Sequence, residues 1–333
     1  MVTSPQKLRL CCPRCRQALE EIAEGLRCPG CSRVYPAVLG IPDLRIAPDP
    51  WIGIEADRAK GQQLERETAD LDFEAMVGAY WAMTPETPAK QALRFISHVK
   101  TAEARSAEWL ATLQPPIKPG ERWLDLGCGT ADIAAAAGAG VETVSLDVAF
   151  RWLVVARRRL KERRVPSQLI CGNAEALPFP DRSFDRVLML GTLEHCPELE
   201  PVLSEAGRVL RAGGLLHLRS ANRFSALPEP HVGLFGVGWL PRAWADPYVR
   251  WRTGGRYQQH WLRGAMELRR ALRRADFRGV RVEAAALLKA ESDRLPALLR
   301  RAGPTYAWLR RTPGFRWVCR RVAPLLEASG QAS

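Results

Sequence analysis

The sequence predicts an α/β protein built on a doubly wound, mostly parallel sheet, and three observations support this prediction. Short apolar runs alternate with helical segments between residues 118 and 290. Glycines stand at the turns between them, which is typical of strands that are followed by helices. The chain has 333 residues, enough for one large α/β domain and a small additional module.

The predicted elements follow one another in a regular order. The expected strands are Arg122–Leu126, Glu142–Asp147, Ser167–Cys171, Phe184–Leu190 and Gly214–Ser220. The expected helices between them are Ala131–Ala137, Phe150–Arg163 and Leu199–Arg211. A helix at Arg263–Ala275 and a strand at Val280–Leu287 come later. Residues 222–262, between these two groups, exceed the usual loop length and are typical of a substrate lid.

The rest of the chain divides into three parts. Residues 1–46 contain a cysteine module, and residues 47–117 are interpreted as a linker and a helical cap. The helical pattern of this cap is interrupted by the prolines of Thr84–Pro88. Residues 118–290 form the main domain, and residues 291–333 are expected to be a basic helical tail. Within that tail, Val318–Leu326 is a weak candidate for the last strand of the sheet.

Four cysteines near the N-terminus have the spacing of a metal site. Cys12-Pro-Arg-Cys15 and Cys28-Pro-Gly-Cys31 are two C-x-x-C pairs separated by twelve residues. Each pair can hold one edge of a tetrahedral ion, so four thiolates would form a closed structural Zn²⁺ site. Cys11 lies beside this spacing but outside it, and a redox dithiol is the alternative interpretation.

A Gly-x-Gly turn follows the first predicted strand and indicates a nucleoside site. Gly127 and Gly129 would let a ligand lie against bare backbone. Asp147 ends the second strand, where a carboxylate can accept hydrogen bonds from both ribose hydroxyls. Asp132 stands where a dinucleotide fold has its third glycine, and its charge would repel a pyrophosphate. The pattern therefore favours a nucleoside without phosphate over a dinucleotide.

Together with Gly172-Asn-Ala-Glu-Ala-Leu-Pro-Phe-Pro-Asp181 and Ser183-Phe-Asp185, residues 118–221 resemble the class I S-adenosylmethionine methyltransferases, which have a Rossmann-like sheet. The closest resemblance is to the ubiquinone and menaquinone methyltransferase branch. The tail of the cysteine module, with Tyr35-Pro36 and Gly40-Ile41-Pro42, resembles a zinc-ribbon-like family that is fused to, or docked on, methyltransferases.

The resemblance implies S-adenosylmethionine as cofactor and assigns roles to residues of this chain. Gly127 and Gly129 would line its methionine and ribose, Asp147 would hold the ribose, and Asp125 would order the turn or reach the cofactor ammonium through water. The further cofactor-binding residues expected are Cys128, Val148, Asn173, Ala174 and Leu190. The family usually has Asp at the position of Asn173, so we expect an altered contact to the adenine amino group there, and a backbone N–H from Ala174 to the ring.

Histidines are the candidates for proton transfer to or from the acceptor. Methyl transfer is an in-line displacement, so a base is needed only when the acceptor must lose a proton. His195 follows the fourth strand and is the expected catalytic residue, with bracing of the pocket as the alternative. His231 and His260 lie in the long segment after the fifth strand.

Aromatic residues there predict either an apolar acceptor pocket or ordinary lid packing: Trp239, Trp244, Trp251, Trp261, Phe224 and Phe235. Tyr80 and Trp81 are expected to close the opposite side.

Positive charge is concentrated near the C-terminus. Residues 250–321 contain 18 Arg and one Lys against five acidic residues, which accounts for the whole net charge of +13. Arg pairs alternate with apolar residues in Leu295–Arg301, Tyr306–Arg311 and Phe315–Arg321. This pattern suits a membrane surface, RNA phosphate or a packed amphipathic helix. With no apolar run of membrane-spanning length, we expect a cytoplasmic protein, peripheral to the membrane if the first alternative holds.

Three functions are compatible with the sequence. The first is a methyltransferase acting on a small-molecule or lipid-like acceptor. The second is an RNA-base methyltransferase, favoured by the cysteine module and the positive charge. The third is a non-catalytic scaffold, which the intact series Asp125, Gly127, Gly129 and Asp147 disfavours.

Overall fold

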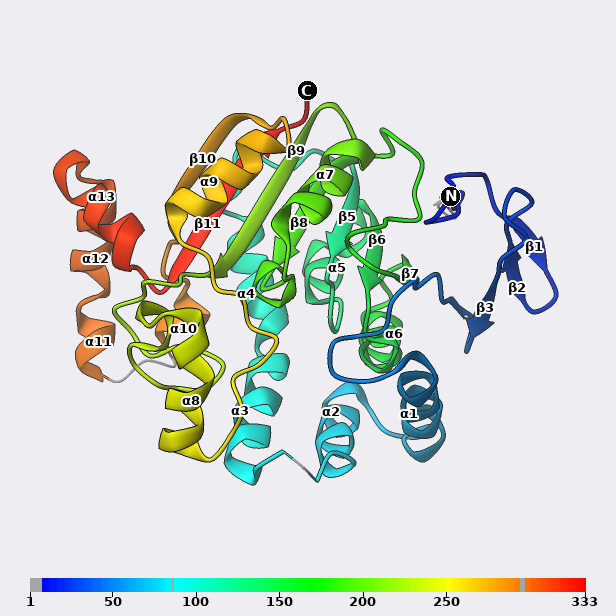
Figure 1. Cartoon of the computed structure of the whole chain (residues 1–333), viewed down its shortest axis with the longest axis horizontal. Helices are drawn as coiled ribbons and strands as arrows, with labels where there is room; N and C mark the ends of the chain where they lie inside the picture. Colours follow the sequence, from blue (N-terminus) through cyan, green and yellow to red (C-terminus); the bar gives the residue numbers. More distant parts are fainter. Residues whose placement is uncertain (1–7, 86, 294–296) are drawn as a thin grey trace. The chain divides into compact units, whose positions relative to one another are not determined.

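The computed structural model describes residues 8–85, 87–293 and 297–333, and the chain separates into two compact units, Met1–Arg186 and Val187–Ser333. The tail position Leu295 lies outside the described residues. The seven strands of the main sheet are β5 (Arg122–Leu126), β6 (Glu142–Asp147), β7 (Ser167–Cys171), β8 (Phe184–Leu190), β9 (Leu210–Ala221), β10 (Arg278–Ala284) and β11 (Leu325–Gln331). Their order in the sheet is β10-β11-β9-β8-β5-β6-β7 (Figure 1). The order runs outward from β5 in both directions, which confirms the predicted doubly wound α/β class.

The first unit begins with a small antiparallel sheet. Its strands are β1 (Glu20–Ile22), β2 (Gly25–Arg27), β3 (Val34–Val38) and β4 (Ile41–Pro42). Gly25 is required in β2, because a Cβ built there would lie 2.3 Å from the carbonyl oxygen of Tyr35. Beyond β4, Asp43 forms a parallel bridge with Cys171, and the Leu44 N–H donates to the Cys171 carbonyl at 2.8 Å. The module therefore pairs with β7, the last strand of the main sheet.

Among the described residues, four helices follow where the sequence predicts a helical cap; their number was not predicted. They are α1 (Ile54–Glu67), α2 (Phe73–Ala82), α3 (Ala89–Lys100) and α4 (Ala102–Leu110). Leu64, Met76 and Val77 of α1 and α2 are buried in one apolar cluster with Phe150 and Val154 of α6 (Phe150–Arg163).

The parallel part of this unit alternates strands with helices. It contains β5 (Arg122–Leu126), α5 (Asp132–Ala137), β6 (Glu142–Asp147), α6 (Phe150–Arg163) and β7 (Ser167–Cys171), and β5, β6 and β7 pair in parallel. Strand β8 (Phe184–Leu190) begins in this unit and ends in the second. All four strands have the predicted bounds.

The second unit continues with α7 (Leu199–Val209), β9 (Leu210–Ala221), α8 (Arg242–Thr253), α9 (Ala265–Arg274) and β10 (Arg278–Ala284). It ends with α10 (Lys289–Ser292), α11 (Ala297–Arg301), α12 (Gly303–Arg311), α13 (Pro313–Val322) and β11 (Leu325–Gln331). Among the described residues, no helix has the length and apolar character of a membrane span.

The predicted helical tail is wrong at its end. Strand β11 pairs antiparallel with both β9 and β10, so it lies inside the sheet. The weak candidate Val318–Leu326 is mostly the end of α13, and the strand starts only at Leu325. In β11 the residues Leu326, Ala328 and Gly330 alternate as buried positions, and no residue is β-branched. The residues of this segment have a low intrinsic preference for strands, and pairing with a strand on each side stabilises the segment as a strand.

Candidate functional site

The glycine turn between β5 and α5 leaves backbone exposed beside the tip of β6. Gly127 and Gly129 have φ values of 74° and 49°, which favour glycine. The N–H groups of Gly127 and Cys128 donate to the Leu146 carbonyl at 2.8 and 3.0 Å, which fixes the turn against β6. A Cβ built at Gly129 would meet no atom within 4 Å, so there is open space beside this backbone.

Asp147 lies against the same turn, as the sequence predicts. One carboxylate oxygen accepts the Gly129 N–H at 2.8 Å and the other accepts the Ala149 N–H at 2.8 Å. Burial raises the pKa of Asp147 above its ordinary value, while these two amide hydrogen bonds act in the opposite direction. The amides fix the direction of the carboxylate, so a bound group could share its remaining lone pairs.

Three carboxylates surround the turn. Asp125 is 2% exposed in β5, and its Oδ2 has no hydrogen-bond partner among the described residues. Burial, followed by the nearby carboxylates of Asp132 and Asp147, raises the pKa of Asp125 well above its usual range. A cationic ligand would relieve this repulsion, whereas a pyrophosphate would increase it. The site therefore fits a ligand that carries positive charge and no phosphate.

The Asn173 side chain is held by the linker after the cysteine module. Its Oδ1 accepts the N–H groups of Ile46 and Ala47 at 2.8 and 3.2 Å, and its Nδ2 donates to the Ala47 carbonyl at 3.3 Å. The side chain therefore contacts the linker, and its contact with the adenine amino group stays a prediction. An amide can both donate to and accept from a peptide backbone, which an Asp at this position could not do.

The other expected cofactor residues have different places. Val148 lies at the tip of β6, where its carbonyl accepts a hydrogen bond from Arg45 at 3.1 Å. Ala174 is half-buried after β7, and Leu190 is half-buried at the end of β8. The Cys128 side chain is buried in the apolar cluster of α1, α2 and α6, so only its backbone can face a ligand.

A buried ionic network supports the site, and the sequence analysis missed it. Arg45 pairs with Asp43 and Asp57 at 2.6 Å each, and Arg151 pairs with Asp57 at 2.7 Å and Asp49 at 3.0 Å. All five residues are at most 7% exposed. Asp57 also accepts the N–H of Phe150 at 2.7 Å, so it caps the N-terminus of α6. No local pattern marks these residues, because the pairs join segments up to about one hundred residues apart.

In the second unit the structure brings the three candidate histidines together. The ring of His195 lies 5.3 Å from that of His231 and 5.4 Å from that of His260, and the rings of His231 and His260 are 4.3 Å apart. The Nδ1 atom of His231 lies 2.5 Å from a carboxylate oxygen of Glu229, which is 4% exposed. Tyr257 stacks on His260 at 5.0 Å. We call these residues the histidine cluster.

The pKa values of His260 and Glu229 indicate different roles within the histidine cluster. Burial, and then the neighbouring His231 and His195, lower the pKa of His260 to about 3, so this ring is neutral at neutral pH. Burial would raise the pKa of Glu229, but the hydrogen bond and charge of His231 lower it below its ordinary value. A carboxylate that accepts the Nδ1 proton holds a histidine in the tautomer whose Nε2 takes up protons.

The aromatic residues between β9 and α9 do not form an enclosed apolar pocket. Trp239, Trp244, Trp251 and Phe235 are 45%, 66%, 76% and 61% exposed. Phe224 contacts Trp239 at 5.4 Å, and the Trp261 N–H donates to the Glu194 carbonyl at 2.7 Å. Tyr80 and Trp81 are packing residues in the first unit, where Tyr80 contacts Trp152 and Trp81 stacks on Phe95.

The four cysteines of the N-terminal module converge. Their sulfur atoms all lie within 4.8 Å of one another, with Cys12–Cys31 at 3.7 Å and Cys15–Cys28 at 3.3 Å. Tetrahedral zinc with bonds of 2.3 Å places its sulfur ligands about 3.8 Å apart, so the set fits this ion. Burial alone would raise the pKa of Cys12, but the Tyr35 hydroxyl and nearby backbone amides lower it to about 6, which favours the thiolate.

Comparison with known proteins agrees with the geometry of the turn. A family profile described as a methyltransferase domain matches residues 124–218. A demethylmenaquinone methyltransferase of Geobacillus sp. (strain WCH70) is 39% identical over 103 residues, 29% of this chain and 44% of that protein. A ubiquinone/menaquinone biosynthesis C-methyltransferase of Rhodopseudomonas palustris (strain BisB5) is 39% identical over 111 residues, 31% of this chain and 44% of that protein.

A solved structure is also similar, at lower identity. A methyltransferase from Thermotoga maritima, described as a possible histamine N-methyltransferase, has 20% identity and a TM-score of 0.46 and covers 78% of this chain and 98% of its own. The chain spans less than half the length of the curated relatives named above. The family profile runs from within β5 to within β9 and includes the glycine turn and Asp147. Residues 124–218 of this chain are therefore a methyltransferase domain.

Proposed function

We propose that this protein is an S-adenosylmethionine-dependent methyltransferase that acts on a small-molecule or lipid-like acceptor. The observation that carries the proposal is the group of carboxylates Asp125, Asp132 and Asp147 around an open glycine turn. S-adenosylmethionine carries a sulfonium, an ammonium and no phosphate, so its charge complements this group. When bound, it supplies an activated methyl group.

The residues of the first unit would bind and orient this cofactor. Gly127 and Gly129 present backbone to it, and Asp147, already held by the Gly129 and Ala149 amides, would accept its ribose hydroxyls. Asp125 would complement its positive end. Holding the reacting groups in line is the main contribution that such a protein makes to the rate.

In the second unit, the histidine cluster would take up the acceptor's proton. His195 directly follows β8, and the Glu229–His231 pair lies beside it. This arrangement supports an acceptor whose nucleophilic atom carries an exchangeable proton, as in a phenol, a hydroquinone or an alcohol. The two relatives are named for demethylmenaquinone and for ubiquinone/menaquinone biosynthesis, which supports a quinone-related acceptor. The second is named a C-methyltransferase, and for methylation at carbon the base would remove the proton of a ring hydroxyl that activates the carbon, or the proton of the ring carbon itself.

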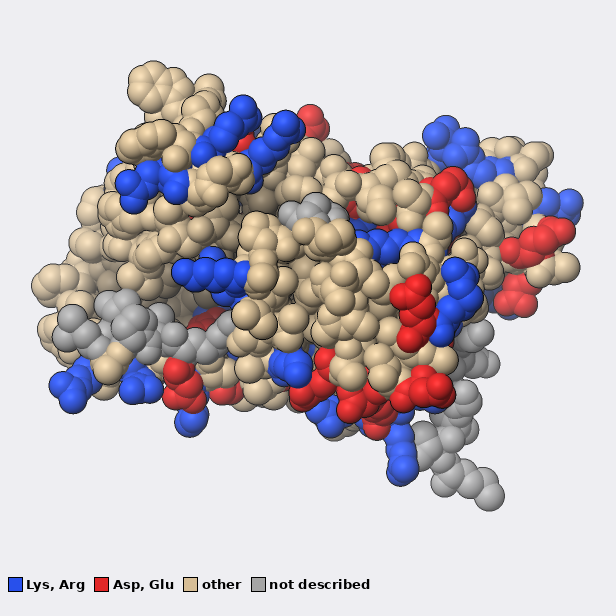
Figure 2. Space-filling model, turned by 90° about the horizontal axis from the view of Figure 1, so that it is seen from below, with Lys and Arg blue, Asp and Glu red and all other residues tan. Residues whose placement is uncertain are grey.

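RNA is the second acceptor class, and one surface observation disfavours it. On the face drawn in Figure 2, Lys and Arg side chains form separate groups with acidic and uncharged residues between them. A protein that follows a nucleic-acid backbone usually presents a continuous basic groove. RNA is therefore included as an alternative acceptor in the methyl-uptake experiment below.

Calorimetric titration tests the cofactor site. Wild-type protein is expected to bind S-adenosylmethionine, and Asp147→Ala to bind it about ten- to a hundredfold more weakly, since a charge-assisted hydrogen-bond acceptor is lost. Asp181→Ala, which removes an exposed carboxylate, is the matched control. Equal affinity of Asp147→Ala and wild type would refute the assigned site.

Labelled methyl uptake then tests the acceptor. Hydroquinones, hydroxylated lipids and RNA are offered in parallel, with wild type and His195→Asn. Uptake by a hydroquinone or lipid that slows in His195→Asn at unchanged cofactor affinity supports the proposal. Uptake by RNA alone would overturn the acceptor assignment and leave the cofactor site standing.

A further inference from the structure

Strands β10 and β11 are joined by a connection far longer than their pairing needs. They are antiparallel neighbours, and such strands can be joined by a hairpin loop of two to five residues. Here residues 285–324 connect them and contain α10 to α13. Connections of this length in a compact protein usually carry a function of their own.

The inner side of α12 and α13 is fully used in packing. Tyr306 and Leu309 of α12 and Cys319 of α13 form a small cluster with Ala284 and Ala323. The Tyr306 hydroxyl donates to the Ala285 carbonyl at 2.7 Å. This side anchors the two helices to the end of β10.

Three aromatic residues and one valine of the same helices are exposed, and on α13 Phe315 and Trp317 lie about 160° apart around the helix axis. Trp308, Phe315, Trp317 and Val318 are 60%, 49%, 61% and 43% exposed, and the rings of Trp308 and Phe315 lie 6.2 Å apart. We call these four residues the aromatic surface. Tryptophan is enriched at membrane interfaces, because its ring is apolar and its N–H can bond to headgroups or water.

The charge around the aromatic surface has one sign. Residues 297–322 contain seven Arg and no Asp or Glu. Arg320 lies 3.8 Å from Glu283, but within the described parts of the chain Arg311 and Arg316 have no acidic side chain within 4.0 Å. A solvated packing helix would carry charges of both signs, so this surface is complementary to an anionic layer.

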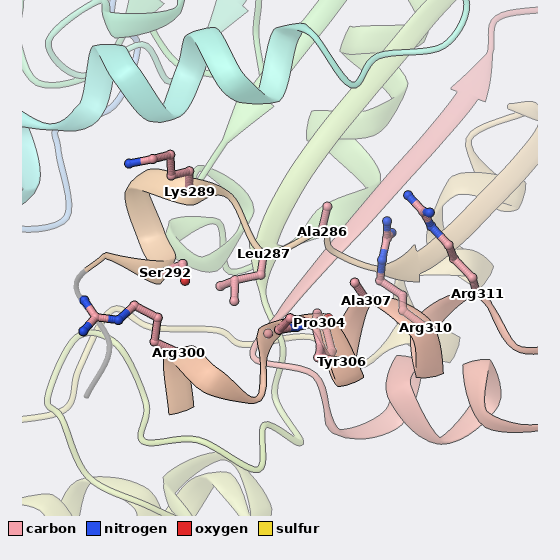
Figure 3. A pocket seen from close by; sticks show the side chains of 11 residues that line it. Ala286, Leu287, Lys289, Ser292, Arg300, Pro304, Tyr306, Ala307, Arg310 and Arg311 are labelled. Carbon is pink, nitrogen blue, oxygen red and sulfur yellow. The ribbon is translucent and has the colours of Figure 1, made fainter. Parts of the chain in front are cut away.

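A pocket of about 440 Å³ opens beside α12. Figure 3 shows Arg300 at one end and Arg310 and Arg311 at the other, with Leu287 and Pro304 between them. Arg310 also donates to the Ala284 carbonyl at 3.0 Å, which fixes its position. An arginine at one end of this pocket could hold a phosphate group, while Leu287 and Pro304 contact an attached apolar chain.

We propose that α12 and α13 dock this protein on an anionic lipid surface, with the aromatic surface at headgroup level and a lipid phosphate in the pocket beside α12. The aromatic residues supply the apolar insertion. Because positive charge is in excess on this surface, the docking is selective for anionic over neutral lipid. This docking is a property of the second unit and does not depend on the identity of the methyl acceptor.

Sedimentation of the full chain with lipid vesicles tests the proposal. Vesicles of phosphatidylcholine alone are compared with vesicles that also contain phosphatidylglycerol, at low and at raised salt. Binding is expected only with the anionic lipid and should weaken with salt. Each Arg→Ala at Arg311 or Arg316 should reduce partitioning about fivefold, and the pair should reduce it further. Trp308→Ser with Trp317→Ser should remove most of it.

The controls separate this surface from general stickiness. Trp251→Ser with Arg252→Ala changes an exposed tryptophan and its neighbouring arginine on α8, and is expected to bind vesicles as wild type does. Thermal melting verifies that each variant is folded. Equal loss in the α8 control would place the docking elsewhere and overturn the proposal. Two other results would also overturn the proposal. The first is vesicle binding that inorganic phosphate abolishes but that the two tryptophan substitutions do not change. The second is binding to RNA without binding to vesicles.

Discussion

At the scale of residues, the carboxylates at the glycine turn differ in their partners: Asp132 lies 3.9 Å from Arg159, whereas Oδ2 of the buried Asp125 has no hydrogen-bond partner among the described residues. Asp125 is fully desolvated, and its charge is opposed by Asp132 and Asp147. Such a carboxylate lowers the stability of the ligand-free fold and would favour the binding of a cationic ligand. Trade-offs of this kind between stability and function are common. The same carboxylate therefore affects both the fold and the ligand.

Asp125→Asn should stabilise the ligand-free protein and weaken cofactor binding. The amide keeps the shape and removes the charge, so the free energy of unfolding near neutral pH should rise by about 1–3 kcal/mol. The folded pKa lies above 3.8, so the penalty of Asp125 grows as the pH rises from 3.8 through the folded pKa. The gain should therefore appear in denaturant titrations near pH 7 and shrink toward pH 4.

Asp181→Asn is the control for this prediction, because Asp181 is exposed. A loss of stability in Asp125→Asn at neutral pH would mean that the charged carboxylate is stabilised within the fold. Tighter binding of S-adenosylmethionine by the variant would contradict the assigned role of Asp125.

At the scale of elements, the strands whose sequence is locally distinctive were predictable. β5 to β8 are short apolar runs with an acid or glycine at their ends, and their bounds are as predicted. β11 was not, because Leu325–Gln331 has no β-branched residue and becomes a strand only between β9 and β10. The linker contact of Asn173 was also hidden, since it joins residues about 127 positions apart.

The place of β11 predicts what deletion of the tail will do. A chain that ends at Asp293 loses α11 to α13 and also the strand that separates β9 from β10. Leu326 and Ala328, which are 1% and 5% exposed, would be removed from the core. We expect the second unit to lose its cooperative melting transition, measured by circular dichroism. A truncated chain that melts as the full chain does would refute the position of β11. Point variants on α12 and α13 are therefore the better probes of lipid docking.

At the scale of the molecule, the N-terminal module is continuous with the proposed cofactor site of the first unit. The cysteines hold β1 to β4, and Asp43 and Leu44 pair with Cys171 of β7. Ile46 and Ala47 then bind Asn173, and the ionic network reaches the start of α6 beside Asp147. A change in the metal site has a direct structural path to the nucleoside site.

Loss of zinc should consequently weaken cofactor binding. The module has too small a core to fold alone, so Zn²⁺ would supply much of its folding free energy. Cys28→Ser should lose zinc by elemental analysis, expose residues 8–46 to protease and reduce S-adenosylmethionine affinity about tenfold, as measured by calorimetry, by releasing the linker from Asn173. Cys11→Ser alters the neighbouring thiol outside the four-cysteine set and should retain the metal.

If Cys28→Ser loses zinc and still binds the cofactor as wild type does, the module is a separate appendage and the path through Asn173 carries no coupling. If it keeps its zinc, the four-cysteine site itself is wrong.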